Sequence, residues 1–267
     1  MKDYETLSPR EKRKHRIKER RKKRAKRIFF TIGCLAIGLL GLMVFVQSPV
    51  FSIEKIEVTG AVRLSKDEIT AAGLIEGANY FSVSASKAEK MLEKNPFVFS
   101  AEIIKKLPDS VTVNIKERKP RVYIKYGDSF VLVDETGYIL GVETYASDSS
   151  LPVATGMSFS EASAGKQIET EDTNIFVTII DISRALSEYN IPNAWSIDVS
   201  DINNITAKIG LWDVYIGSNE NINEKIALFA GAIRSDKVVN EQLLEYEGSF
   251  DISSTKSQYF KMYKYSV

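Results

Sequence analysis

The chain has 267 residues, of which 44% are hydrophobic and 27% charged. This composition is typical of a folded protein with one or two domains and excludes a fibrous or wholly disordered one. The single cysteine, Cys34, and the single histidine, His15, exclude a disulfide framework, a zinc site built from several Cys and His, and a Ser-His-Asp catalytic set within a folded domain. We therefore expect no metal ion and no cofactor.

The formal net charge of +1 conceals a strong asymmetry. Most residues from Arg10 to Arg27 are Lys or Arg, whereas acidic residues outnumber basic ones in the rest of the chain. A basic cluster directly before a single apolar span holds that flank in the cytoplasm. Residues 1–27 are thus predicted to be a basic cytoplasmic tail, acting either as a topological signal alone or also by binding anionic lipid headgroups. Without a DNA-binding fold, we expect no nucleic acid as a partner.

An uncharged apolar run, Ile28–Val46, follows the tail. As a helix it would measure about 28 Å, close to the hydrocarbon thickness of a bilayer. We predict a retained transmembrane helix over residues 28–50, which places the chain from about Gln47 onward outside the cell. A cleaved signal peptide is the alternative, but the run is longer than the usual signal hydrophobic region and no small-x-small cleavage site follows it.

The next segment predicts a small α+β unit. Strands are expected at Phe51–Val58, Phe97–Lys105 and Val111–Lys116 because β-branched residues alternate there. Capping-box patterns at Ser65 and Ser86 predict two short helices between the first two strands. Two short helices cover only one face of a three-stranded sheet, so this β-α-α-β-β unit is expected to present an open edge or face.

The pattern continues into a larger unit. A hairpin is expected at Phe130–Val133 and Tyr138–Val142, and apolar stripes predict amphipathic helices at Asp172–Tyr189 and Ile222–Ile233. Residues 143–170 lack a pattern and are interpreted as connecting loops. Further strands are expected at Trp195–Val199, Ile205–Ile209, Asp213–Ile216, Gly248–Ile252 and Tyr259–Tyr263.

Four segments carry a recognisable pattern: Ile56–Gly60, Asn95–Val98, Leu107–Pro120 and Phe130–Gly137. With them, the segment Phe51–Pro120 resembles a POTRA domain, and the whole layout resembles the FtsQ/DivIB family of bacterial cell-division proteins. It implies an α+β fold: a single N-terminal transmembrane helix, a POTRA domain at 51–120, a larger mixed sheet domain with two long helices (the β domain, 121–252), and a C-terminal strand at 253–267.

The resemblance also implies the function: a non-enzymatic scaffold at the division septum that binds the bitopic proteins FtsL and FtsB (or DivIC) and helps control septal wall synthesis. It supports an interface at the C-terminal strands, where tyrosines recur at period two and an edge strand accepts a partner. Glu117 and Arg118 are interpreted first as a structural ion pair that sets domain orientation and second as a partner contact. The candidate partner-binding residues are Glu117, Arg118, Phe250, Ile252, Tyr259, Lys261 and Tyr263.

Two other classes of function remain as alternatives. A membrane-anchored peptidoglycan hydrolase would have to use external carboxylates as its acid and base, because no external His or Cys is present. A POTRA-type assembly chaperone is the other alternative, although such proteins usually carry repeated POTRA units and a membrane barrel. No phosphate-cradling loop is present, so we expect no small-molecule substrate. The carboxylates considered for the hydrolase are Asp134, Glu135, Asp181, Asp198, Asp201 and Asp213.

Overall fold

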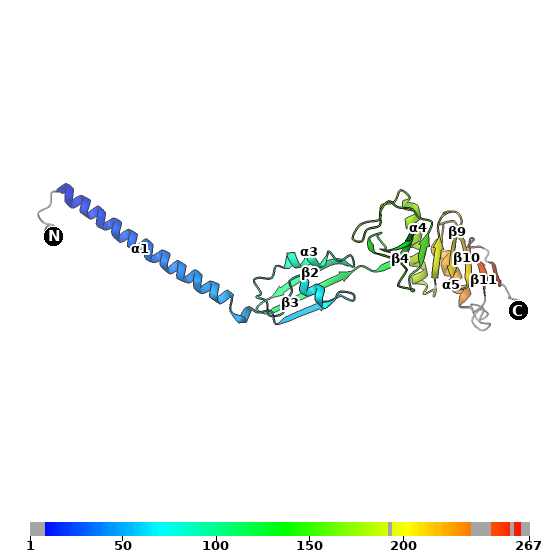
Figure 1. Ribbon diagram of the computed structural model, residues 1–267, viewed down its shortest axis with the longest axis horizontal. Helices are drawn as coiled ribbons and strands as arrows, with labels where there is room; N and C mark the ends of the chain where they lie inside the picture. The colour runs from blue at the N-terminus through cyan, green and yellow to red at the C-terminus, as the bar shows by residue number, and fades with distance from the viewer. Residues whose placement is uncertain (1–8, 192–193, 236–246, 257–258, 263–267) are drawn as a thin grey trace. The chain divides into compact units, whose positions relative to one another are not determined.

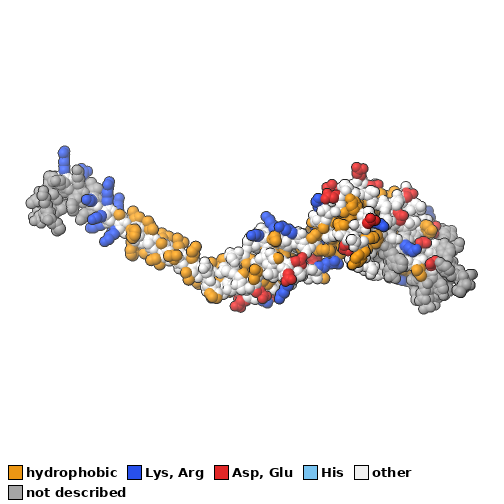
Figure 2. Space-filling view, in the orientation of Figure 1, with side chains coloured by type: hydrophobic (Ala, Val, Ile, Leu, Met, Phe, Trp, Pro, Cys, Tyr) orange, Lys and Arg blue, Asp and Glu red, His pale blue; other side chains and the backbone are white. Residues whose placement is uncertain are grey.

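The computed structural model describes residues 9–191, 194–235, 247–256 and 259–262. Helix α1 runs from Pro9 to Val46, so the basic tail from Pro9 onward and the apolar run form one continuous helix (Figure 1). Its segment Arg20–Val46 is the one helix of the described chain that is long and apolar enough to cross a membrane. Figure 2 shows basic side chains along the first part of α1 and hydrophobic ones along the second. The apolar helix predicted from the sequence is confirmed.

A short 3-10 helix, η2 (Pro49–Phe51), follows α1. The first strand, β1, is Lys55–Thr59 and therefore begins four residues later than predicted. The physical reason is local, because Pro49 favours the first turn of a helix and the hydroxyl of Ser48 accepts a hydrogen bond from the backbone N–H of Val50.

The small sheet has three strands in the order β1-β3-β2. Strands β2 (Val98–Lys106) and β3 (Ser110–Glu117) lie within one residue of their predicted bounds. Helix α2 is Lys66–Ala71, and helix α3 is Ala85–Leu92, which begins one residue before the predicted capping box. On β3, Val111, Val113 and Ile115 are buried and alternate with partly exposed residues, so one face of this sheet is covered.

The large sheet has nine strands in the order β12-β11-β10-β9-β8-β7-β4-β5-β6 (Figure 1 labels β4, β9, β10 and β11). Their bounds are β4 Pro120–Tyr126, β5 Ser129–Asp134, β6 Ile139–Glu143, β7 Val153–Thr155, β8 Ala194–Asp198, β9 Ile205–Ile209, β10 Trp212–Gly217, β11 Gly248–Asp251 and β12 Tyr259–Met262. Parallel pairs at β4/β7, β7/β8 and β10/β11 make this a mixed sheet, as predicted.

Two of these strands were not predicted. Strand β7 lies inside the segment interpreted as loops and joins β8 to β4, so it connects the two halves of the sheet. Its three residues are too few to show a period. Strand β4 was missed because Val122, Tyr123 and Ile124 are consecutive buried residues rather than an alternating set. Such a run is typical of a strand that is buried on both faces.

Helices α4 (Thr173–Glu188) and α5 (Ile222–Ile233) match the two predicted amphipathic helices and contact each other. Their apolar stripes share one core with the facing side chains of the sheet, including Ile179, Ile226 and Trp212. The core thus lies between the two helices and one face of the large sheet. The expected fold, one apolar helix followed by a small α+β unit and a larger sheet with two long helices, is confirmed.

The chain divides into two compact units. The first contains Met1–Val58, Lys66–Ala88 and Ile103–Val113, and the second contains Thr59–Ser65, Glu89–Glu102 and Asn114–Val267. The domain bounds expected from the sequence, at residues 51–120 and 121–252, stay a prediction.

Candidate interaction surfaces

Glu117 ends β3 and receives backbone hydrogen bonds from the loop that follows β1. Its Oε1 accepts from the N–H groups of Val62 and Arg63, both at 2.8 Å, and of Leu64 at 3.3 Å. Gly60 opens this loop with a φ of +76°, and a Cβ there would lie 2.1 Å from the carbonyl oxygen of Ile115. The side chain of Glu117 therefore holds the loop against β3.

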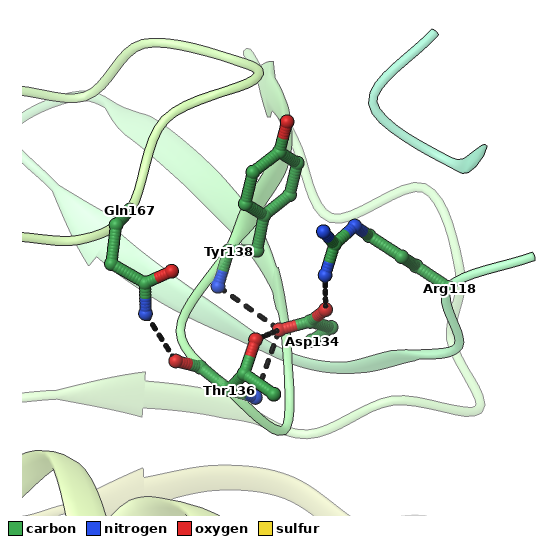
Figure 3. Close-up of polar contacts among 5 residues, drawn as sticks. All are labelled: Arg118, Asp134, Thr136, Tyr138 and Gln167. Atoms are coloured by element: carbon green, nitrogen blue, oxygen red, sulfur yellow. Dashed lines mark hydrogen bonds and ion pairs between the residues drawn. The ribbon is translucent and has the colours of Figure 1, made fainter. Parts of the chain in front are cut away.

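Arg118, the next residue, contacts the hairpin of the large sheet (Figure 3). Its Nη1 donates to Oδ2 of Asp134 at 2.8 Å, and the two side chains are only 14% and 6% exposed. The guanidinium lies 3.7 Å from the centre of the Tyr138 ring and 4.9 Å from that of Phe99, both within the range of cation–π attraction. Arg118 is thus enclosed by one carboxylate and two aromatic rings.

Asp134 organises the turn between β5 and β6. Its Oδ1 accepts from the backbone N–H and the hydroxyl of Thr136, at 2.8 and 2.7 Å, and from the N–H of Tyr138 at 3.0 Å. Burial alone would raise the pKa of this carboxyl, but the hydrogen bonds from Thr136, Tyr138 and Arg118 outweigh it and lower the pKa below its usual value. Gln167 adds a bond from its side-chain amide to the carbonyl of Thr136.

The two residues predicted to form an ion pair therefore have different partners. Glu117 binds backbone N–H groups, and Arg118 pairs with Asp134, sixteen residues further along the chain. The Glu117 carboxylate and Nη1 of Arg118 are thus bonded within the chain, whereas the buried Nε of Arg118 has no hydrogen-bond partner in the described structure. Groups bonded within the chain fix local structure more than they offer free bonds. A contact of Glu117 or Arg118 with a partner protein stays a prediction.

Two of the predicted C-terminal residues lie in the core. Phe250 on β11 is 2% exposed, and its ring lies 4.7 Å from that of Trp212 and 5.0 Å from that of Phe229. Ile252 is 1% exposed and its N–H donates to the carbonyl of Tyr215 at 2.9 Å. In this structure, both side chains stabilise the end of the large sheet rather than form its surface.

Strand β12 is the last strand at one edge of the described sheet. It runs antiparallel to β11, with Tyr259 opposite Asp251 and Lys261 opposite Ser249. Tyr263 lies outside the described residues. Tyr259 and Lys261 thus belong to an edge strand, which is the kind of element to which a partner strand can add.

One face of the sheet at this end is exposed in the described part of the chain. On β10, Trp212, Val214 and Ile216 are buried beneath the helices, whereas Asp213 is exposed and Tyr215 is 45% exposed. The strand register places Tyr215 between Thr206 on β9 and Asp251 on β11. Leu211, in the turn before β10, is also 42% exposed. This surface, which we call the open face, combines an aromatic ring with charged and hydroxyl groups.

The carboxylates considered for hydrolysis are all bonded to neighbouring groups. Asp134 is described above, Glu135 pairs with Arg121, Asp181 with Arg184 and Asp213 with Lys208. Asp198 and Asp201 accept hydrogen bonds from residues two positions further on. Within the described residues, no group of three or more His, Cys, Asp and Glu side chains could hold a metal ion.

The described chain combines an apolar N-terminal helix, a small α+β sheet and a larger mixed sheet. Known proteins are similar to it in sequence. Residues 51–118 match the model of the POTRA domain, FtsQ-type. The chain is 32% identical over 148 residues to the cell division protein DivIB of Bacillus subtilis, covering 55% of this chain and 56% of that protein.

Two further relatives carry the same names. The chain is 34% identical over 102 residues to the cell division protein FtsQ of Corynebacterium glutamicum, covering 38% of this chain and 46% of that protein. It is 29% identical over 160 residues to the cell division protein DivIB of Clostridium botulinum, covering 59% and 60%. The chain thus spans about half the length of these relatives. The resemblance to the FtsQ/DivIB family predicted from the sequence is confirmed.

Proposed function

We propose that the protein is a membrane-anchored, non-enzymatic scaffold of bacterial cell division. Similarity to proteins named DivIB and FtsQ supports the role in division. The apolar helix and the basic residues before it support a single-pass arrangement, with a cytoplasmic N-terminus and with the folded part outside. In this proposal the basic tail also contacts anionic lipid headgroups.

The partners in this proposal are bitopic division proteins resembling FtsL and FtsB or DivIC. The observation that carries it is the open face at the β12 end of the sheet: the exposed Tyr215 and Asp213 lie on β10, and β12, two strands away, is the last strand of the described sheet. Tyrosine is enriched at the energetic centres of interfaces, and an edge strand supplies backbone hydrogen bonds. Tyr259 and Lys261 contribute from β12, while Phe250 and Ile252 support the surface from the core.

The scaffold is tested by where the protein accumulates. A fluorescent fusion to the N-terminus, expressed at native level in dividing cells, is expected to concentrate at the septum and to lose that position when residues 51–267 are removed. A uniform membrane signal together with normal septa on depletion would contradict the division role.

The proposed partner surface is tested by co-purification of the full-length protein with the FtsB-like or DivIC-like protein of the same organism. Tyr215→Ala is expected to reduce capture at least tenfold, because it removes the exposed ring from the open face. Tyr145→Ala is the matched control, since Tyr145 is 68% exposed and lies in the loop after β6. Capture unchanged by Tyr215→Ala, or reduced equally by both variants, would contradict an interface at the open face.

A further inference from the structure

An aromatic cluster lies where α1 leaves the predicted bilayer. The rings of Phe45, near the end of α1, and Phe51, in η2, have centroids 5.3 Å apart in an edge-to-face arrangement. Phe51 in turn lies 5.1 Å from Phe81, which lies 5.3 Å from Tyr80. Residues 79–81 belong to the loop between α2 and α3, so the cluster joins the apolar helix directly to the small α+β unit.

A polar contact reinforces this connection. The side-chain amide of Asn79 donates to the carbonyl oxygen of Val46 at 2.8 Å, which satisfies one of the carbonyls left unpaired at the end of α1. The same side chain accepts a hydrogen bond from the N–H of Phe81 at 2.9 Å, and the N–H of Tyr80 donates to the carbonyl of Phe51 at 2.7 Å. The end of α1 and the loop are thus held together by both rings and hydrogen bonds.

Lys105 on β2 also fixes this loop, which contains residues 79–81. The ammonium group of Lys105 donates to the carbonyls of Tyr80 and Val83 and lies 4.3 Å from the centre of the Tyr80 ring. Because these bonds order the loop, Phe81 is held in its exposed orientation before any binding, and binding requires no rearrangement of the loop.

Several apolar side chains of this region are nevertheless exposed. Val50 is 62% exposed and Phe81 is 49% exposed, at the end of a helix whose own apolar residues are exposed and which is long and apolar enough to cross a membrane. Segments 47–53 and 77–86 contain no charged residue. In the turn between β2 and β3, the backbone carbonyl of Asp109 accepts a hydrogen bond from the N–H of Glu54. The same turn contributes a further exposed apolar side chain, Leu107, which is 64% exposed. An exposed apolar patch continuous with a membrane helix fits the interfacial zone of a bilayer.

We propose that Val50, Phe51 and Phe81 form a docking surface for the outer leaflet of the membrane, with their side chains at the boundary between headgroups and acyl chains. The occupant is the lipid surface itself. Docking would fix the small unit against the membrane at the exit of α1, so that the protein does not swing on a free linker. This inference rests on the membrane-anchored part of the proposed function and goes beyond its partner-binding part.

The test uses the full-length protein in proteoliposomes of phosphatidylethanolamine and phosphatidylglycerol, with an environment-sensitive fluorophore on single cysteines. The native Cys34 in the apolar run serves as the bilayer reference. Phe81→Cys and Val50→Cys, each in a Cys34→Ala background, report on the docking surface. Val50→Cys leaves the aromatic contacts intact, so it guards against an effect of losing the Phe81 ring. Val177→Cys is the control, because Val177 on α4 is exposed to a similar degree, 53%.

Quenching by lipids brominated on the acyl chain is the measurement. The account predicts strong quenching at Cys34, at least twofold quenching at positions 50 and 81 that is greatest with bromine close to the headgroup, and none at position 177. Quenching at 50 and 81 no greater than at 177, with Cys34 still quenched, would overturn the docking surface and leave the anchor intact. An unquenched Cys34 would overturn the membrane anchor and the docking surface together.

Discussion

The two ends of the nine-stranded sheet differ in what covers the face turned away from the helices. At the β4–β6 end, Tyr123, Leu132 and Leu140 are buried on that face and form a second cluster with residues such as Leu151. The hydroxyl of Tyr123 contacts Ser147 at 3.1 Å. At the β9–β12 end, Tyr215 on the corresponding face stays 45% exposed in the described chain.

This difference separates residues that the fold itself uses from residues left to a partner. At the covered end, the carboxylate of Asp134 accepts hydrogen bonds from the guanidinium of Arg118 and the backbone N–H of Tyr138, and the guanidinium lies over the Tyr138 ring. At the other end, the helices cover one face of β10 and β11, while Tyr215 stays 45% exposed and β12 is the last strand of the described sheet. Substitutions at the first set are therefore expected to reduce stability, and substitutions at the second set to reduce binding.

The largest effect is expected at a core residue of the open end. Phe250→Ala should lower the free energy of unfolding by about 3–5 kcal/mol, because it removes a buried ring and leaves a cavity beside Trp212 and Phe229. Urea unfolding measures this loss. A loss below about 1 kcal/mol would mean that Phe250 is not a core residue. It would then support the prediction that Phe250 contacts a partner directly.

Asp134→Ala should come next, with a loss of about 3 kcal/mol, because it leaves the enclosed Arg118 without its counter-charge and also removes the acceptor of the turn. Asp134→Asn is the matched variant: it keeps an acceptor for Thr136 and Tyr138 but loses the ion pair, so its loss should be smaller. Equal unfolding midpoints for wild type and Asp134→Ala would refute the structural role of this cluster.

Glu117→Ala should cost about 2 kcal/mol, since a charged acceptor of backbone N–H groups is lost. Glu117→Gln, which keeps one acceptor oxygen, should recover most of that loss. Urea unfolding of the two variants gives the comparison. Equal losses for Glu117→Gln and Glu117→Ala would contradict the hydrogen bonds to the loop as the source of the effect. They would point instead to a contact of Glu117 that depends on its charge.

The pH dependence should show the effect of Asp134 separately. Because folding lowers the pKa of this carboxyl, its contribution to stability is present above the unfolded pKa of about 3.9 and is lost as the pH falls through the lower folded value. Wild type should therefore lose stability more steeply below about pH 4 than Asp134→Asn. Parallel acid-denaturation curves for the two proteins would contradict the assigned hydrogen bonds.

The smallest effect on stability is expected at the open face. Tyr215→Ala should change the free energy of unfolding by no more than about 0.5 kcal/mol, because the ring is exposed and no described core cluster contains it. A loss comparable to that of Phe250→Ala would show that the face is covered within the folded chain.

Periodicity predicted the elements that have one covered face or a long apolar stripe. Helices α4 and α5, the β5–β6 hairpin and strands β8–β10 fall within a few residues of their expected bounds. It missed β4 and β7, because one is buried on both faces and the other has only three residues. The pairing of Arg118 with Asp134 depends on which strands become neighbours, and a local pattern carries no such information. The alternation around Phe250 could be read from the sequence. Which of the two faces α5 covers could not, so Phe250 was expected at the surface.

Hydrogen–deuterium exchange of the full-length protein, with and without its FtsB-like or DivIC-like partner, tests the central claim most directly. The account predicts that the partner slows exchange in β9–β12, residues 205–217 and 248–262, and leaves β4–β6 unchanged. Protection confined to residues 120–143, with β9–β12 unaffected, would contradict the proposal that the open end of the large sheet binds the partner.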